Sequence, residues 1–350
     1  MRAGILYDDH TIKVGTAPDP TIGPDDLLVQ SDYAGICGTD LHIYRGEFTA
    51  RVQYPAIQGH EFGGVVEEVG KNVQHFKIGD RVAVDPIISC HSCVACQTGH
   101  INACRTLKLL GVDLDGGYGQ YVAVPAAQAL HLPDSVPMKH VPMVEMYGLG
   151  HHILKRGQVQ PGEIVVILGA GKLGLSILDV LCHSAGAATT IVVDLQPFRL
   201  ETARKLGADY VINIAEEDPV ARILELTHGS RADCVIEAVG HYHLMDGQEA
   251  PLAQAVQMIR NGGRVVTAGL GEQLTAVHFK TLVIKEAQII ASRVTLGEFP
   301  QAIRLMAKGI LHPDLLITHQ MPLADITQAF DIVDRDDPST IKIVLDVQDI

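Results

Sequence analysis

Short apolar runs, rich in β-branched residues and broken by glycine, dominate the first quarter of the chain. Such runs occupy residues 27–29, 63–66 and 81–84. β-Branched side chains favour the pleated surface of a sheet, and glycine marks the turns and bulges between strands. The pattern therefore predicts a β-rich domain in the N-terminal part of the chain.

After Pro161 and Gly162 the pattern changes, because apolar runs of strand length now alternate with segments of helical length. The alternating segments are 163–168, 173–181, 190–194, 198–206 and 210–213, with further strands expected at 233–237 and 264–268. This alternation indicates βαβ units and a parallel sheet. Beyond Ser292 we expect a helix near 299–308 and a strand at 342–346, in a part of the chain that rejoins the first domain.

Length and charge narrow the classes of protein to consider. A chain of 350 residues exceeds the usual size of a single core, so two domains are expected. No apolar run reaches the roughly 18 residues of a membrane-spanning helix, and a formal charge of −14 disfavours a nucleic-acid partner. The start of the chain lacks the apolar region of a secretory signal, which predicts a soluble protein in the reducing cytoplasm.

Four cysteines lie within fifteen residues, and their spacing indicates a metal site. Cys90, Cys93, Cys96 and Cys104 follow a C-x2-C-x2-C-x7-C pattern. Zinc prefers four tetrahedral thiolates, and this spacing allows all four to turn toward one ion and leave no open position. The alternatives, two disulfides or unrelated buried thiols, fit a reducing compartment less well. We therefore expect a closed, structural zinc site.

A glycine-rich turn is expected to bind a dinucleotide. Gly169, Gly171 and Gly174, with Lys172 and Leu173 between them, follow an apolar strand and open a helix, which is the context that gives a G-x-G-x-x-G motif its meaning. The N-terminus of that helix would hold the phosphates. The turns after the later strands, at Val239 and at Gly269 and Leu270, are expected to line the same site.

Asp194, at the end of the next strand, is expected to determine which dinucleotide binds. Its carboxylate would accept hydrogen bonds from the adenosine ribose and repel a 2′-phosphate, which favours NAD over NADP. Arg199 lies close behind it in the sequence and weakens that preference. The alternative is that Asp194 only caps the following helix.

Cys37, His60 and Glu61 are the residues that suggest a second metal site. Each is a ligand type found at catalytic zinc, and glycines surround the pair His60 and Glu61. With the four-cysteine lobe and the dinucleotide motif, the chain resembles the zinc-dependent medium-chain alcohol dehydrogenases, in the branch of sorbitol (polyol), threonine and butanediol dehydrogenases. The resemblance covers nearly the whole chain and includes Gly64, Gly70 and Val73 downstream.

The resemblance implies a fold and its division into domains. The fold class is α/β, with a GroES-like β-rich catalytic domain and a Rossmann domain built on a doubly wound parallel sheet. The catalytic domain would span 1–147, with the structural zinc lobe at about 88–106. The NAD-binding domain would span 148–289, and residues 290–350 would return to the catalytic domain.

It also implies roles for individual residues. Cys37 and His60 would bind the catalytic zinc, with Glu61 or Glu145 as a further ligand, although Met146 replaces the proline that relatives usually carry after that glutamate. Asp40 would orient His60. Thr39 would touch the substrate oxygen, His42 would pass its proton to solvent, and Arg293 would lie near the substrate. The remaining histidines that stand out, namely His151, His152, His241 and His243, are interpreted as structural or surface residues.

The activity implied is reversible, NAD-linked oxidation of a secondary alcohol with two zinc ions per chain, one catalytic and one structural. A polyol, sugar acid or vicinal diol is the expected substrate, and L-threonine is the alternative, because residues 37–44 also resemble threonine dehydrogenases. A catalytically silent zinc- and NAD-binding structural protein and a zinc-free quinone reductase are rivals of other kinds. Relatives suggest a homotetramer, or a homodimer, with residues 281–290 as part of a paired sheet edge.

Overall fold

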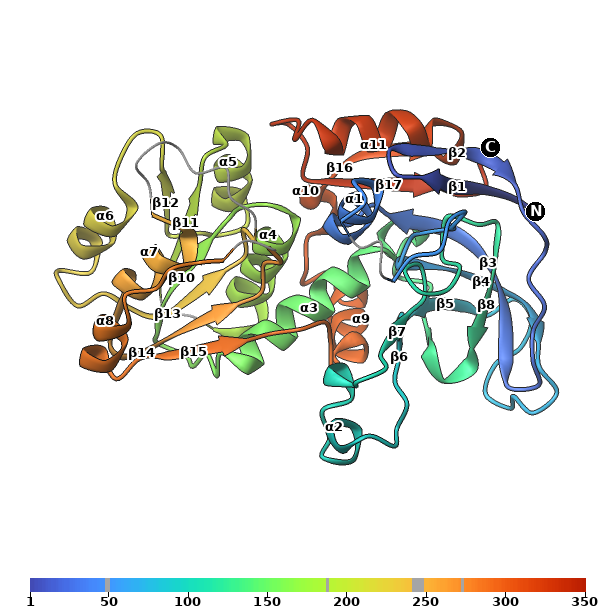
Figure 1. The fold of residues 1–350 in the computed structure, drawn as a ribbon, viewed down its shortest axis with the longest axis horizontal. Coiled ribbons are helices and arrows are strands. Elements are labelled where there is room, and N and C mark those ends of the chain that lie inside the picture. The colour runs from blue at the N-terminus through green and yellow to red at the C-terminus, as the bar shows by residue number, and fades with distance from the viewer. Residues whose placement is uncertain (48–50, 187–188, 241–248, 272–273) are drawn as a thin grey trace. The chain divides into compact units, whose positions relative to one another are not determined.

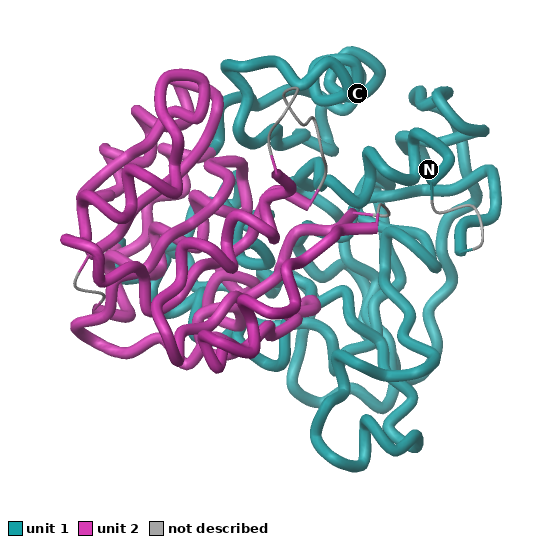
Figure 2. The backbone as a smooth tube through the Cα atoms, turned by 60° about the vertical axis from the view of Figure 1, so that its left-hand side comes forward, with its two compact units in different colours: residues 1–146, 295–309, 317–350 teal, residues 147–294, 310–316 magenta. Residues whose placement is uncertain are grey.

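The computed structural model describes residues 1–47, 51–186, 189–240, 249–271 and 274–350. The chain divides into two compact units, shown in teal and magenta in Figure 2. The first comprises residues 1–146, 295–309 and 317–350, and the second comprises residues 147–294 and 310–316. The sequence prediction assigned all of 290–350 to a single return, and the short second crossing at 310–316 was not part of it.

The first unit is built mainly from antiparallel strands (Figure 1). Its strands are β1 (Arg2–Asp8), β2 (Thr11–Thr16), β3 (Asp26–Gly35), β4 (Glu61–Val69), β5 (Arg81–Val84), β6 (Ile87–Ile88), β7 (Lys108–Leu109), β8 (Tyr121–Pro125), β9 (Ala129–His131), β16 (Ile317–Pro322) and β17 (Lys342–Asp346). The main sheet has the order β16-β17-β3-β4-β5-β9, and β8 also pairs with β3. The expected strands at 27–29, 63–66, 81–84 and 342–346 are all confirmed.

Helices and a shared apolar interior complete this unit. The helices are α1 (Gly38–Tyr44), α2 (Val94–Gln97), α9 (Phe299–Ala307) and α11 (Ile326–Asp334), and α3 (Met143–Arg156) begins here and continues into the second unit. Alternate residues of β3, such as Leu27 and Val29, are fully buried, as expected for a strand with one face toward a core. The helix predicted near 299–308 is confirmed as α9.

The second unit contains a six-stranded parallel sheet in the order β12-β11-β10-β13-β14-β15. The strands are β10 (Ile164–Leu168), β11 (Thr189–Asp194), β12 (Tyr210–Asn213), β13 (Ala232–Glu237), β14 (Ile259–Thr267) and β15 (Gln288–Ala291). Counted along the chain, this order is 3-2-1-4-5-6, the arrangement of a Rossmann fold. The prediction of a parallel, doubly wound sheet is confirmed, and the strand order reverses between β10 and β13, where such sheets bind ligands.

Helices connect these strands and bury the central ones. They are α4 (Lys172–Val180), α5 (Pro197–Lys205), α6 (Pro219–Leu226), α7 (Pro251–Met258) and α8 (Phe279–Lys285). A further short helix, α10 (Pro313–Leu316), connects no strands of this sheet and packs against α4 and α5. Strand β10 is almost wholly buried and reads Ile-Val-Val-Ile-Leu, as expected for a central strand covered on both faces. Among the described residues, none of the helices is both long enough and apolar enough to cross a membrane.

One predicted element is wrong in part. Residues 281–290 were expected to form a sheet edge, but 281–285 lie in helix α8, and only β15 from Gln288 onward is strand. Thr281–Lys285 forms the last turns of helix α8, and Lys285 at its end donates to the carbonyl of Val256 in α7 and to that of Ile259 directly after α7. An apolar run of this length cannot be assigned to strand or helix by its pattern alone.

Candidate functional site

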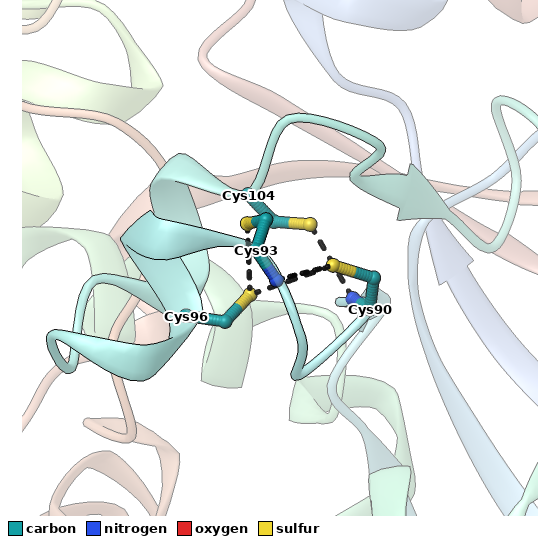
Figure 3. Close-up of side chains that lie close together, drawn as sticks. All are labelled: Cys90, Cys93, Cys96 and Cys104. Carbon is teal, nitrogen blue, oxygen red and sulfur yellow. Dashed lines mark hydrogen bonds between the residues drawn. The ribbon is translucent and has the colours of Figure 1, made fainter.

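Four cysteines converge in a lobe between β6 and β7 (Figure 3). Cys93 precedes helix α2 and Cys96 lies within it, so the helical turn brings both sulfurs to one side. The Sγ atom of Cys96 lies 3.5 Å from that of Cys93 and 4.0 Å from that of Cys90. All four Sγ atoms, including that of Cys104, lie within 4.8 Å of one another, and the cysteines form no disulfide.

This geometry fits zinc. Thiolates about 2.3 Å from a tetrahedral ion lie about 3.8 Å from one another, close to the separations seen here. Hydrogen bonds from Ser92 and from the Cys93 N–H lower the pKa of Cys90 to about 5, whereas desolvation and neighbouring thiols raise the pKa of Cys96 to about 12. The lobe thus holds both thiolate and thiol at neutral pH, and zinc binding would release the remaining protons.

Three predicted ligands of the second site come together in the first unit. Cys37 caps the N-terminus of α1, directly after β3, and Glu61 begins β4. Gly59 has φ +95°, and a Cβ atom there would lie 2.6 Å from the ring of Tyr118, so only glycine allows the turn that presents His60. One ligand atom each of Cys37, His60 and Glu61 lies within 4.8 Å of the other two.

Asp40 contacts two of these three residues, Cys37 and His60. It is fully buried and accepts hydrogen bonds from the Cys37 N–H at 2.7 Å and the Tyr118 hydroxyl at 3.1 Å, and its Oδ1 lies 3.6 Å from Nδ1 of His60. Burial would raise the pKa of Asp40, but the charge of His60 and these hydrogen bonds lower it overall. Asp40 therefore stays ionised and can orient the imidazole of His60.

The charges around His60 favour a cation. Burial lowers the pKa of this imidazole, but Cys37 and Asp40 outweigh burial and raise the pKa well above its ordinary value. Nδ1 of His60 faces Oδ1 of Asp40 at 3.6 Å, whereas Oε1 of Glu61 is buried without a hydrogen-bond partner among the described residues. Unpaired buried polar atoms are costly, so a metal ion bound by this group is a good fit.

Lys342 is a residue of this site that sequence reasoning missed. Its Nζ contacts Oε2 of Glu61 and donates to the Ile36 carbonyl at 3.2 Å, and the side chains of Lys342 and Glu61 are both fully buried. A lysine inside the apolar strand β17 was the available signal, because lysine is almost never fully buried unless it is paired.

Glu145 lies close to these residues without joining them. It is buried in the first turn of α3 and is not part of the three-residue group within 4.8 Å. Burial, together with the charges of Cys37, Asp85 and Asp40, raises its pKa to about 8 against the opposing effect of His60. A carboxyl group with that pKa would be largely protonated near neutral pH unless a cation bound beside it.

The other residues predicted for catalysis are distributed over both units. Thr39 and His42 lie on α1, where Thr39 is partly buried and Nδ1 of His42 contacts the carboxylate of Glu47. Arg293 belongs to the second unit, two residues after β15, and is exposed. His151 and His152 are buried in α3, in agreement with a structural role, and His241 and His243 lie outside the described residues.

The glycine motif lies between β10 and α4. Gly169 has φ +94°, and a Cβ atom on Gly174 would lie 1.8 Å from the Gly169 carbonyl, so helix and loop approach too closely for any side chain. A Cβ atom on Gly171 would meet nothing within 4 Å. Gly171 caps the N-terminus of α4, ahead of Lys172 and Leu173. The space beside it, at the N-terminus of a helix, fits a pyrophosphate.

Asp194 links this loop to the end of β11. Its Oδ2 accepts from the Ala170 N–H at 2.6 Å and its Oδ1 from the Gln196 N–H at 2.7 Å. The carboxylate therefore holds the glycine loop as well as the start of α5, on which Arg199 is partly buried. Each carboxylate oxygen has a second lone pair, so hydrogen bonds to a ribose remain available.

The turns after β13 and β14 approach each other closely. Oε1 of Glu237 accepts from the N–H groups of Val239 and Gly240 at 2.8 and 3.0 Å. A Cβ atom on Gly269 would lie 2.3 Å from the Gly240 nitrogen, and Leu270 beside it is exposed. Val239, Gly269 and Leu270 therefore lie at the carboxyl ends of the strands, as the glycine motif does. Glu237, which orders this turn, was not predicted from the sequence.

Comparison with known proteins identifies the family. Residues 23–134 match the alcohol dehydrogenase GroES-like domain, and residues 173–308 match the zinc-binding dehydrogenase domain. The chain belongs to the zinc-dependent medium-chain alcohol dehydrogenase family. The family resemblance and the fold class expected from the sequence are both confirmed, and so is the expectation of an NAD(P)-linked alcohol oxidoreductase.

Three relatives span almost the whole chain. The starvation-sensing protein RspB of Escherichia coli K12 is 34% identical over 99% of both chains, and a crystal structure of rspB from E. coli CFT073 with NADH has a TM-score of 0.91 at 32% identity and 99% coverage of both. Sorbitol dehydrogenase of Bacillus subtilis is 33% identical, covering 95% of this chain and 93% of its own. L-Threonine 3-dehydrogenase of Bacillus velezensis is 34% identical, covering 90% of each chain.

Proposed function

We propose that this chain interconverts a secondary alcohol and its ketone with NAD, using a catalytic zinc bound by Cys37 and His60 together with Glu61 or Glu145. The observation that carries the proposal is that ligand atoms of Cys37, His60 and Glu61 lie within 4.8 Å of one another. The buried Asp40 contacts Cys37 and His60 and holds them in place. Zinc held there would act as a Lewis acid that lowers the pKa of a substrate hydroxyl toward neutrality. NAD would accept the hydride.

The residues of the chain would position the reactants and move the proton. Asp40 would hold His60 in one orientation and increase the basicity of the ring nitrogen that binds the metal. The Thr39 hydroxyl would accept the proton of the substrate hydroxyl and donate its own proton to the nicotinamide ribose. His42, three residues later on the same helix, would take the proton from the ribose and release it to solvent. The contact between His42 and Glu47 orients that imidazole. Arg293 is proposed to contact the substrate.

The cofactor and the metal content follow from the same residues. Gly171, Lys172 and Leu173 would bind the pyrophosphate, on a loop whose shape depends on Gly169 and Gly174. The turns at Val239, Gly269 and Leu270 would line the nicotinamide end. Asp194 would prefer NAD over NADP through the ribose hydroxyls, with Arg199 nearby. The cysteine lobe would hold a second, structural zinc, so that each chain would carry two ions.

Polyols, sugar acids and vicinal diols are the proposed substrates, because a second hydroxyl could meet Glu145 or Arg293. The similarity to sorbitol dehydrogenase supports this class. L-Threonine is the alternative, and the similarity to L-threonine 3-dehydrogenase supports it about equally. A panel of these four classes, assayed for NADH formation with NADP as control, would separate them. Absence of turnover with NAD bound would favour a silent structural protein.

The proposed assembly is a homotetramer, or a homodimer, in the cytoplasm. β15 is an edge strand of its sheet, and exposed apolar side chains gather on it and on α8. These are Phe279, Val283, Ile284 and Ile289, with exposed fractions of 76, 64, 66 and 42%. Exposed apolar groups beside an open sheet edge are typical of a subunit interface.

Replacement of single ligands tests the catalytic proposal. Cys37→Ala and His60→Ala should each lower kcat by at least about 1,000-fold, since they remove ligands of the metal. NADH binding, measured by fluorescence titration, should be retained, because the nucleotide residues belong to the other unit. The exposed His75→Ala serves as the matched control. Substantial turnover by both ligand variants would contradict the proposed mechanism.

A further inference from the structure

A cluster of one aspartate and two histidines in the second unit belongs to neither proposed zinc site. Asp179 lies near the C-terminal end of α4, and His183 lies in the π-helical turn Leu181–Ala185 that continues it. His312 directly precedes α10, in the segment 310–316 that crosses back into this unit. Single π-helical turns are rare and occur often at functional sites.

The three side chains converge on one carboxylate oxygen. Oδ1 of Asp179 lies 3.0 Å from Nδ1 of His183 and 2.9 Å from Nδ1 of His312. The two imidazole rings lie 4.5 Å apart between centroids, tilted by 57°. One ligand atom from each residue lies within 4.8 Å of the others. Ligands about 2.1 Å from a tetrahedral ion lie about 3.4 Å apart, so shifts of about half an ångström would admit one.

The carboxylate is held in place by other groups. Oδ2 of Asp179 accepts from the Tyr147 hydroxyl at 2.8 Å and from the backbone N–H of His312 at 2.7 Å. Burial, together with the proximity of Asp179, raises the pKa of Tyr147 well above its ordinary value, so this hydroxyl remains a donor. Hydrogen bonds of this kind orient a ligating carboxylate at metal sites.

Asp179 is a buried carboxyl group with two histidines beside it. Its side chain is fully buried, and in the described part of the chain its ion-pair partners are His183 and His312. A buried carboxylate is costly unless a cation compensates it. The histidine side chains are 31 and 40% exposed, which leaves a route for an ion and room for water as a further ligand.

We propose that Asp179, His183 and His312 bind a divalent transition-metal ion, through two imidazole nitrogens and one carboxylate oxygen, with water completing the coordination. This donor set favours zinc, cobalt, nickel or copper over magnesium or calcium, which prefer oxygen ligands. The ion would cross-link the end of α4 to the segment before α10, two parts of the unit that are 129 residues apart between His183 and His312.

Cobalt uptake by the full-length protein, as purified with its zinc, tests the site. Wild type should bind one more Co²⁺ per chain than His183→Ala/His312→Ala, measured by equilibrium dialysis and elemental analysis. Each single variant should bind at least about tenfold more weakly. His278→Ala, an exposed histidine of the same unit, is the control and should bind as wild type does. Should the double variant fail to fold, His183→Gln and His312→Gln serve in its place.

The spectrum of the bound ion separates this site from the cysteine sites. Cobalt with nitrogen and oxygen ligands shows d–d bands without the intense ultraviolet charge-transfer bands of thiolate ligands. Ni²⁺ should also raise the melting temperature of wild type but not of the double variant. Equal uptake by wild type and double variant, thiolate bands, or binding only in the millimolar range would each overturn the proposal. The two histidines would then serve as hydrogen-bond partners of Asp179.

Discussion

In the first unit, individual buried charged residues surround the proposed ligands of the catalytic zinc. Lys342 and Glu61 show this, because the lysine neutralises a carboxylate that the sequence suggested only as a zinc ligand. Burial lowers the pKa of Lys342 to about 8, although Cys37 and Asp40 oppose the change. Removal of one partner from such a buried pair is more costly than loss of the pair itself. The charge of Glu61 is therefore compensated by Lys342, a residue 281 positions later in the chain.

Asp85 provides a pH-dependent prediction at this scale. Burial raises its pKa from 3.8 to about 6; the Ile87 N–H bond opposes this and Glu298 adds to it. The folded state then binds more protons than the unfolded state between these values, so stability falls as pH rises through the window. Asp85→Asn keeps the acceptor for Ile87 and removes the charge. The variant should be more stable by at most about 3 kcal/mol at pH 7.5 and about half as much at pH 5.

Thermal unfolding of the zinc-loaded proteins at the two pH values would measure this difference. Asp134→Asn, at an exposed carboxylate in the same unit, is the control and should show little change at either pH. A stability gain for Asp85→Asn that is the same at pH 5 and pH 7.5 would show that the charge of Asp85 is not the cause.

At the scale of elements, the loop between β10 and α4 contains one glycine that is needed for packing and another that leaves space for a ligand. Two glycines of one motif have opposite surroundings. A Cβ atom added to Gly174 would overlap the Gly169 carbonyl, whereas a Cβ atom added to Gly171 would contact nothing. Gly174 therefore serves the contact between helix and strand, whereas Gly171 leaves space for a ligand. Periodicity of the motif alone does not distinguish these two roles.

This difference predicts opposite effects of two alanine substitutions. Gly174→Ala should destabilise the protein by about 1–3 kcal/mol, because the backbone must move to relieve the overlap. Gly171→Ala should leave the melting temperature almost unchanged but weaken NADH binding by about tenfold or more, because the methyl group would occupy the pyrophosphate space. Thermal unfolding and NADH titration of both variants would measure this. Equal effects of the two substitutions on stability would contradict the assignment.

At the scale of the whole molecule, the association of subunits depends on apolar surface that is exposed in the single chain. Ile289 lies on the edge strand β15 and is 42% exposed, and α8, the preceding helix in the chain, also carries exposed apolar side chains. Ile78, in the first unit, is 67% exposed but lies outside the strands. Scattered exposed apolar residues are normal, whereas a cluster at a sheet edge indicates an interface.

Introduction of a charge at this surface should therefore change the assembly. Ile289→Lys should shift the protein from oligomer to smaller species, measured by light scattering after size-exclusion chromatography, because a buried ammonium at an interface lacks a partner. Ile78→Lys is the matched control and should leave the mass unchanged. A monomeric wild-type protein, or an unchanged mass for Ile289→Lys, would rule out an interface at β15.

Local patterns were sufficient for much of this protein. The strands at 163–168 and 342–346, the helix near 299–308 and the cysteine lobe were predictable because hydrophobic periodicity and ligand spacing act over a few residues. The run 281–290 was assigned wrongly in part: its first residues end a helix whose Lys285 contacts the distant carbonyls of Val256 and Ile259. Such a contact is not visible in the run itself.

The sequence by itself determined the family, the fold class and the residue types available for zinc and NAD, since these follow from short motifs and their order. Tertiary structure alone decided which groups meet. It placed Lys342 against Glu61, Tyr118 against Asp40, and His312 beside Asp179 and His183. Each partner lies tens to hundreds of residues away in the chain, or arrives through a different element, and burial makes their charges interact strongly. The spatial distances between such residues are set by the packing of the core.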